Sequence, residues 1–205
     1  MNTGDRELVA RASRGDVEAF TKLVRANSSL VYRVALRILG DEDAQDASQE
    51  VWVRVWGNLK GFRAQSAFST WLYRITVNTC LSLRRSQASR QQKTSEYSEQ
   101  IAYHLPHHHL AAVAHQETEQ EDPEALTLSE ERKEEIQAAL GRIRAEHRAA
   151  LVLRHMEGLS YAEIAEVMGV PDGTAKGWVS RGRAAMLIAL AEEEDSRRAR
   201  KREAR

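Results

Sequence analysis

GLSYAEIAEVMGVPDGTAKGWVSRGRAAM, residues 158–186, carries the strongest local structural signal in the chain. Ser160 and Glu163 have the spacing of a capping box, which predicts the start of a helix. Gly169 supplies the left-handed residue that ends many helices, and the Pro-Asp pair after it is typical of the first turn of another. The segment therefore predicts two helices joined by a tight turn.

The second of these helices has two different faces at 100° per residue. Its inner face is small and apolar, and consists of Ala175, Val179, Gly182 and Met186. The opposite face and its flanks are small and basic, with Gly173, Lys176, Gly177, Trp178, Ser180, Arg181 and Arg183. Such a face fits a DNA major groove, where Arg and Lys reach guanine edges or phosphates. A helical pair that packs on protein is the alternative, and Trp178 suits both, because it can cover the core or stack on DNA.

Outside this segment the whole chain has a helical pattern. It contains only three prolines, and no stretch alternates apolar and polar residues as a strand would. We predict an all-α fold with two small helical domains, residues 1–90 and 126–190. Four helices are expected in the first domain. Their signals are a cap at Gly15 and Asp16, an apolar run over 30–39 that a Gly-Asp pair ends, and helices over 46–59 and 68–85.

The segment between the domains, residues 91–125, is rich in Gln, Ser, Glu and His, and has no sustained apolar stripe. This composition predicts a flexible linker. A helix over about 147–156 is expected before the helix-turn-helix, and the charged tail, residues 191–205, is expected to extend the last helix. The tail's cations could add nonspecific affinity for DNA.

Charge is unevenly distributed along a chain whose formal net charge is +0. Residues 1–90 carry fourteen Lys and Arg against nine Asp and Glu, whereas residues 91–135 carry three against eleven. Residues 136–190 are again basic, with seven against five. Two basic blocks joined by an acidic one indicate two polyanion-binding units with a self-repelling connector, although chance clustering of surface charge would also produce either block.

Composition excludes several classes of protein. The chain is 29% charged, and no stretch approaches the roughly 18 apolar residues of a membrane span. Its first residues lack the apolar run of an export signal, so we expect a cytoplasmic protein without membrane insertion. Cys80 is the single cysteine and is expected to be a small buried hydrophobe. No paired nucleophile and base, phosphate-binding glycine loop or metal-ligand motif is evident, so no enzymatic activity and no cofactor are expected.

Two helices of the first domain have polar arcs that could meet a partner. On the helix over 68–85, Arg74, Asn78 and Arg85 share an arc beside aromatic residues, which suits a single strand whose phosphates need neutralising and whose bases need stacking. A solvated helix face is the alternative. On the helix over 46–59, a polar arc lies opposite an apolar one, as in any amphipathic helix. Its members are Asp46, Gln49, Glu50 and Arg54.

Four segments together resemble the extracytoplasmic-function (ECF) sigma factors of bacterial RNA polymerase. They are DAQDASQEVWVRVWGNLKGF (43–62), FSTWLYRITVNTCLSLRR (68–85), DPEALTLSEE (122–131) and the helix-turn-helix. Four motifs in the right order are far more specific than a helix-turn-helix alone. The resemblance covers nearly the whole chain and implies that residues 1–90 are sigma region 2 and residues 126–190 are region 4.

The resemblance also implies roles for the candidate residues. Region 2 would open the −10 element and hold a flipped base with Phe62, Arg63 and Asn78, while Arg74 and Arg85 contact the strand backbone. Region 4 would place its basic helix in the −35 major groove, through Lys176, Trp178, Ser180, Arg181 and Arg183. The polar arc of the helix over 46–59 would dock on the clamp helices of the polymerase β′ subunit. Gly177 and Trp178 depart from the Ser-Arg pair common in the family, which weakens any transfer of −35 specificity.

The expected partners are therefore core RNA polymerase, through its β′ clamp helices and β flap, promoter DNA, and an anti-sigma factor. A stand-alone helix-turn-helix regulator is the alternative, and it would bind duplex operators without polymerase. The family pattern does not explain the linker histidines, His104, His107, His108, His109 and His115. They could hold a zinc or nickel ion, but their spacing defines no tetrahedral site, and a solvated polar linker is the preferred interpretation.

Overall fold

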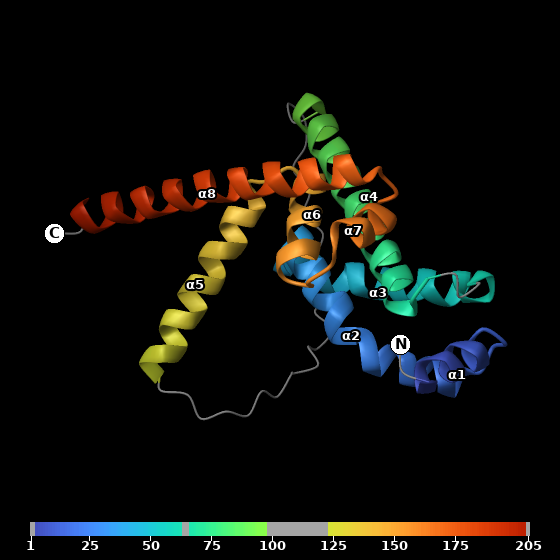
Figure 1. Ribbon diagram of the computed structural model, residues 1–205. Coiled ribbons are helices and arrows are strands. Elements are labelled where there is room, and N and C mark those ends of the chain that lie inside the picture. Colours follow the sequence, from blue (N-terminus) through green and yellow to red (C-terminus); the bar gives the residue numbers. More distant parts are fainter. Residues whose placement is uncertain (1–2, 63–65, 98–122, 204–205) are drawn as a thin grey trace.

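A computed structural model of the chain describes residues 3–62, 66–97 and 123–203, and every regular element in these ranges is a helix (Figure 1). In order they are α1 (Thr3–Ala12), α2 (Val17–Leu39), α3 (Asp41–Asn58), the 3-10 turn η1 (Leu59–Gly61), α4 (Phe68–Tyr97), α5 (Pro123–Gly141), α6 (Ala145–His155), α7 (Tyr161–Met168) and α8 (Asp172–Glu203). The predicted all-α fold is confirmed. None of these helices is long and apolar enough to cross a lipid bilayer.

The first lobe, α1 to α4, has four helices, the number expected, but two of the expected helices are one and α1 was not predicted. The cap at Gly15 and Asp16 and the apolar run over 30–39 belong to one helix, α2, and α1 precedes it. Helix α3 begins at Asp41, five residues before the expected Asp46, because three acidic residues occupy its first turn, where they interact favourably with the helix dipole. Helix α4 continues beyond the expected Arg85, since neither Gly nor Pro follows to stop it before Tyr97.

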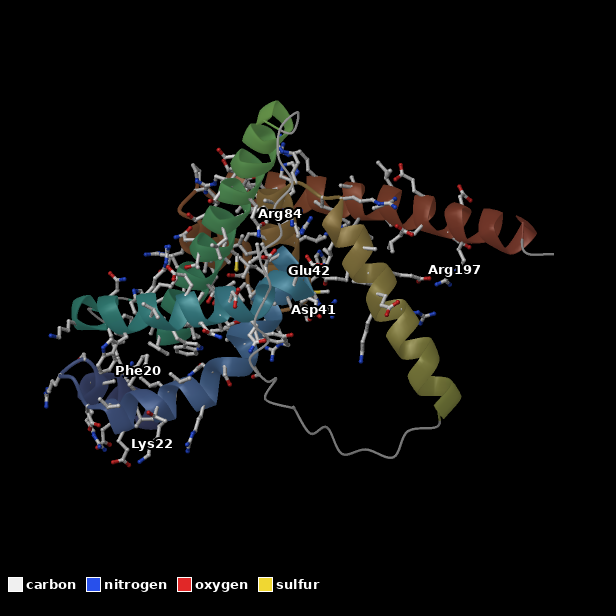
Figure 2. The ribbon with its side chains drawn as sticks, turned by 180° about the vertical axis from the view of Figure 1, so that it is seen from behind. Phe20, Lys22, Asp41, Glu42, Arg84 and Arg197 are labelled. Carbon is white, nitrogen blue, oxygen red and sulfur yellow. The ribbon has the colours of Figure 1, made fainter. Side chains whose placement is uncertain are left out.

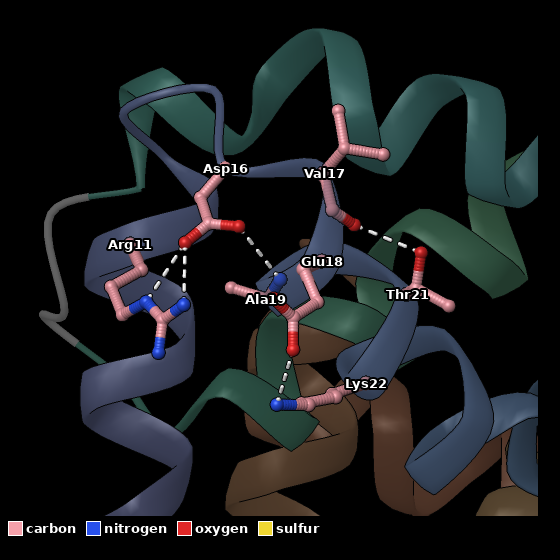
Figure 3. Close-up of polar contacts among 7 residues, drawn as sticks. All are labelled: Arg11, Asp16, Val17, Glu18, Ala19, Thr21 and Lys22. Atoms are coloured by element: carbon pink, nitrogen blue, oxygen red, sulfur yellow. Dashed lines mark hydrogen bonds and ion pairs between the residues drawn. The ribbon is translucent and has the colours of Figure 1, made fainter.

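The turn between α1 and α2 shows how short polar contacts fix the first lobe (Figure 3). The Asp16 carboxylate accepts a hydrogen bond from the Ala19 backbone N–H at 3.0 Å and pairs with Arg11 at 2.7 Å. One turn later Glu18 pairs with Lys22 at 2.8 Å. Capping and the neighbouring cation both favour the ionised carboxylate, so the pKa of Asp16 lies below its usual range. The predicted cap is confirmed.

The second lobe, α5 to α8, contains the predicted helix-turn-helix. Ser160 and Glu163 form a capping box at the start of α7, and Gly169 ends that helix with φ +66°. Gly182 lies where α8 crosses α6, and a Cβ built on it would be 2.7 Å from the His147 carbonyl oxygen. Only glycine therefore permits this approach of α8 to α6.

The two lobes share a hydrophobic core, which the sequence did not predict. One buried cluster contains Val34, Ile38, Val77 and Cys80 of the first lobe together with residues of the second, including Ala149, Leu153, Ile164, Ala165 and Val179. Helix α4 packs against α7, and α2 packs against α6 and α5. Cys80 is fully buried here, as predicted for a small hydrophobe, and burial raises the pKa of its thiol to about 12.

Helix α8 extends well beyond the second lobe and projects away from the first (Figure 1). Ion pairs join this extension to α5 and the turn after it. Arg142 pairs with Glu192 at 3.1 Å and also with Glu193, and Arg197, labelled in Figure 2, pairs with Glu135. The expectation that the tail prolongs the last helix is therefore confirmed as far as Glu203.

Candidate nucleic-acid interface

The outer face of α8 presents the predicted basic residues to solvent. Lys176, Ser180, Arg181 and Arg183 are exposed, whereas Ala175 and Val179 on the inner face are buried. The ammonium of Lys176 lies 5.9 Å from the centre of the Tyr161 ring, a cation–π contact that connects α8 with α7. The arrangement combines a firmly packed inner side with an accessible cationic outer side, which is the requirement for insertion into a major groove.

Trp178 and Gly177 are both half-buried, and Trp178 lies on the side of α8 that faces the first lobe. Trp178 packs against the core shared by the lobes, so the first of its two interpretations, covering the protein core, is the one the structure shows. A Cβ on Gly177 would approach only the guanidinium of Arg181, at 3.2 Å. That neighbour is the end of a flexible side chain, so the fold itself does not require glycine at this position.

The polar arc of Arg74, Asn78 and Arg85 forms a stripe along α4, and the second lobe contacts part of this stripe. The guanidinium of Arg74 donates two hydrogen bonds to the backbone carbonyl of Glu166, at 2.9 and 3.2 Å, and lies 3.3 Å from the Glu166 carboxylate. Asn78 and Arg85, farther along α4, are exposed. The stripe therefore exists as predicted, but its first cation is held by α7.

Asn78 and Arg85 line an open groove of about 650 Å³ between the lobes. The other lining residues are Leu81, Arg144, Glu146, His147, Met168, Trp178 and Arg181. Three arginines face one glutamate here, so the groove is cationic. It thus brings together residues that the sequence assigned separately to single-stranded and to duplex DNA.

His147 also lines this groove. The Nε of Arg181 donates to its Nε2 at 3.3 Å, so that nitrogen accepts and carries no proton. Burial lowers the pKa of His147, and the charges of Arg181 and Arg144 lower it further, while Glu146 opposes them. The imidazole is consequently biased toward its neutral form.

Phe62 lies just before the undescribed residues 63–65 and contributes to an aromatic cluster. Its ring centre is 5.2 Å from that of Trp71 and 5.9 Å from that of Phe68, and its side chain is half-buried. Arg63 falls outside the described residues, as do the linker histidines. Among the residues that the structure describes, no group of three or more His, Cys, Asp or Glu is arranged to hold a metal ion.

The polar arc of α3 lies on the solvent side of the first lobe. Asp46, Gln49 and Arg54 are exposed, and Arg54 pairs with Glu50 at 2.8 Å. Sequence reasoning missed Val53 and Trp56, which are 68% and 40% exposed on this side of the helix. At 100° per residue Val53 lies within the polar arc, so the sequence itself already placed an exposed apolar side chain there.

A second apolar surface lies on the second lobe. It is a groove of about 350 Å³ between α5, α6 and α8, whose lining includes Leu140, Leu151, Val152, Met156 and Met186. Leu187, which also lines it, is 65% exposed. Apolar lining next to exposed Leu is typical of a surface that another protein covers.

Comparison with known proteins identifies both lobes. The family model for Sigma-70 region 2 matches residues 23–90, and the model for Sigma-70, region 4 matches residues 133–186. The chain is 34% identical over 187 residues to the RNA polymerase sigma-H factor of Pseudomonas aeruginosa, covering 91% of this chain and 93% of that protein. It is also 34% identical over 182 residues to the ECF RNA polymerase sigma-E factor of Escherichia coli K12, covering 89% and 92%.

Solved structures with the same fold include CnrH, in complex with the cytosolic domain of CnrY. The TM-score is 0.61 at 23% identity, covering 93% of this chain and 99% of CnrH. A second is the sigma factor RpoE of Bartonella quintana, in complex with the anti-sigma factor NepR, with a TM-score of 0.60 at 21% identity over 84% and 96% of the two chains. At these identities the likeness concerns the fold.

Proposed function

The chain belongs to the ECF sigma factors of the sigma-70 family, and from that premise we propose which residues carry each part of its activity. As a member, it binds core RNA polymerase and directs promoter-specific initiation through the −35 and −10 elements. We propose that it performs no chemistry itself and acts in the cytoplasm, where its polymerase works. The observation that carries the assignment of residues is the exposed basic face of α8 on a firmly packed helix-turn-helix.

The outer face of α8 is proposed to bind the −35 major groove. Arg181 and Arg183 can donate to guanine edges or to phosphates, and Ser180 can donate to either. Lys176, at the start of the face, is suited to a phosphate contact, because an ammonium is a compact point charge without a fixed geometry. Trp178 is assigned to the edge of the interface, where it packs on the core and faces DNA with its remaining exposed surface.

The stripe on α4 is proposed to bind the opened −10 strand. Asn78 would hydrogen-bond a flipped base, with Phe62 and Arg63 forming the rest of the pocket, and Arg74 and Arg85 would neutralise backbone phosphates. The aromatic cluster around Phe62 supports this assignment, because unstacking a base costs a few kcal/mol that a preformed aromatic surface offsets.

Polymerase contacts are proposed on both lobes. Asp46, Gln49, Glu50 and Arg54 would meet the β′ clamp helices, and Val53 would supply the apolar centre of that contact, since protein interfaces surround an apolar core with a polar rim. In the second lobe, the apolar groove between α5, α6 and α8 is assigned to the β flap. Its exposed Leu187 fits a protein better than DNA.

An anti-sigma factor is proposed as the inhibitory partner. RpoE of Bartonella quintana, which has the same fold, was solved with one. A protein of this class would have to cover the promoter-binding or polymerase-binding surfaces named above.

Run-off transcription with purified core polymerase and a promoter library tests the proposal. We expect transcripts from a subset of promoters only when the chain is present. A stand-alone helix-turn-helix regulator would instead retain a duplex operator without polymerase and would not support transcription. Duplex binding that is unchanged by core enzyme, together with no transcript, would refute the assignment.

A further inference from the structure

The side chain of Arg181, assigned above to guanine edges or phosphates, lies along the surface of α8. A Cβ built on Gly177, one turn earlier, would be 3.2 Å from the Nη2 atom of Arg181 and 3.6 Å from its Cζ. Helical side chains lean toward the N-terminus of their helix, so the guanidinium covers the place where the missing Cβ would be. Gly177 therefore provides the space in which the Arg181 guanidinium lies.

The packing of α8 gives no other reason for glycine at position 177. Glycine inside a helix is less favourable than alanine, because it loses more backbone freedom on folding. At Gly182 close packing requires it, since a Cβ there would be 2.7 Å from the His147 carbonyl oxygen. At Gly177 the three nearest heavy atoms, apart from its chain neighbours and the helix backbone, all belong to the Arg181 guanidinium. The glycine thus makes room for the arginine and not for a neighbouring helix.

His147 of α6 holds the same guanidinium from the side. The Nε of Arg181 donates to the Nε2 of His147 at 3.3 Å. Gly182, the residue after Arg181, lies against the His147 backbone where α8 crosses α6, so two packed helices set the distance between donor and acceptor. Burial lowers the pKa of His147, which favours the neutral imidazole and keeps the Nε2 lone pair available. Arg181 is therefore held at two points.

This anchoring leaves the outer end of Arg181 free for DNA. The hydrogen bond to His147 uses the Nε–H, and the Nη1 and Nη2 donors can still form a bidentate contact with O6 and N7 of a guanine. A neutral acceptor also competes less for the cation than a carboxylate does. Arg74 on α4 shows the other case, because the Glu166 carboxylate lies 3.3 Å from its guanidinium. An arginine that is already in place loses less side-chain entropy when it binds.

We propose that His147 and Gly177 are positioning residues for Arg181, and that they set how strongly this sigma factor prefers a guanine at one position of the −35 element. Neither residue needs to touch that base. The inference rests on the proposed placement of α8 in the −35 major groove. A displaced guanidinium still attracts phosphates, because charge acts over a distance, whereas a bidentate contact requires both donors in register. Loss of positioning should therefore lower selectivity more than affinity.

Run-off transcription with core polymerase, on promoters that differ at one −35 base pair at a time, tests this proposal. Arg181→Ala first identifies the base pair that Arg181 reads, where the preference for the best base should fall about tenfold. His147→Leu removes the acceptor and should lower the preference at the same pair about threefold, with little change at the other pairs. His147→Gln keeps an acceptor oxygen and should restore most of the preference. In the Arg181→Ala background, His147→Leu should have no further effect at that pair, since both residues act through one contact.

Gly177→Ala tests the second anchor and separates positioning from stability. Its methyl group displaces the guanidinium, so the preference at the Arg181 base pair should fall about threefold. Alanine favours the helix, so the free energy of unfolding should stay the same or rise. Gly173→Ala is the matched control, because Gly173 lies one turn earlier on α8 and a Cβ there meets nothing within 4 Å. Whatever its effect on binding in general, it should leave the preference at that base pair unchanged.

The outcomes distinguish this inference from the proposed function. If Arg181→Ala lowered the preference at one base pair while His147→Leu and Gly177→Ala did not, Arg181 would read DNA without these anchors, and the inference would be wrong. An equal loss on every −35 sequence in Gly177→Ala would show that the glycine makes room for DNA instead. If Arg181→Ala changed no preference, both its role in base recognition and its positioning would be refuted. Absence of any transcript with the unmodified chain would refute the proposed function itself.

Discussion

The outer face of α8 and the stripe on α4 are both assigned to promoter DNA, yet they differ in accessibility. The cations of α8 are exposed and its inner side is buried, so the surface proposed for duplex DNA is already formed in the isolated chain. On α4, Arg74 is bound to Glu166, and Asn78 and Arg85 face a groove that the second lobe helps to form. The basic face of α8 is therefore accessible in this structure, whereas the stripe on α4 has its first cation held by the second lobe.

The largest effect is expected at the joint between the lobes. Arg148→Met keeps much of the side-chain volume but removes the hydrogen bonds that the Arg148 guanidinium donates to the carbonyls of Ile38, Gly141 and Ile143, of which Gly141 still accepts from Arg84 at 3.4 Å. Each buried carbonyl left without a partner costs about 1–3 kcal/mol, so we expect the free energy of unfolding to fall by about 3 kcal/mol. Urea denaturation followed by circular dichroism measures it.

Arg142→Met is the control for Arg148→Met, because Arg142 is exposed and pairs only with acidic residues of α8 at the surface. Its substitution should change the free energy of unfolding by less than about 1 kcal/mol. A loss as small as this for Arg148→Met would show that the buried guanidinium does not hold the two lobes together. It would then not explain why the stripe on α4 is partly covered while the face of α8 is not.

Removing one residue from each surface should affect different steps of initiation. We expect Asn78→Ala to reduce strand opening about tenfold while changing closed-complex binding little, because a hydrogen-bonded base contributes about 1–3 kcal/mol once it is extruded. Permanganate reactivity of −10 thymines measures opening, and footprinting measures closed-complex binding. Equal losses in both steps would contradict the assignment of α4 to the single strand.

Lys176→Ala is the corresponding change on α8, and its effect should be smaller and of another kind. A phosphate contact carries no sequence information, so closed-complex binding should weaken on all promoters alike, and the slope of log K against log salt should decrease by about 1. Arg181→Ala, by contrast, is expected to relax the preference for particular −35 sequences. Promoter-dependent effects of Lys176→Ala would assign it to base recognition instead.

Local signals in the sequence predicted the elements better than their assembly. The capping box at Ser160 and the left-handed Gly169 depend on residues near one another in the chain, and the structure confirms both. The contact of Tyr73 with Glu157 joins residues 84 positions apart, and nothing in either local pattern marks it. The covering of α4 by α7 therefore could not be predicted from the sequence.

For the candidate site, too, local helix geometry could be predicted and other features could not. Sequence spacing placed the basic residues of α8 on the correct face, because helix geometry alone decides it. It missed the exposed Val53, although helix geometry places this apolar residue inside the polar arc of α3. Gly177 departs from the family pattern, and only the Arg181 guanidinium lies near the position that its Cβ would take, so the fold does not explain this glycine.

The smallest expected effect concerns His147, which lies in the groove where the two surfaces meet. Its neighbours there are Arg181 from α8, Arg144 and Glu146 beside it, and Arg85 from α4. Burial and the arginine charges place its pKa in the folded chain below the ordinary 6.5. The unfolded chain then binds a proton at a higher pH than the folded chain does. Stability is therefore fully present above pH 6.5 and decreases as the pH falls through the folded pKa.

His147→Gln should remove part of this dependence, so the variant should lose less stability than the unmodified chain between about pH 7.5 and about pH 5.5. His155→Gln is the control, since burial and Arg183 and Arg154 lower the pKa of His155 in the same direction but outside the groove. Each variant should therefore reduce the loss of unfolding free energy at the lower pH by the part that its own histidine contributes. If His147→Gln lost as much stability as the unmodified chain over this range, the folded chain would not lower the pKa of His147.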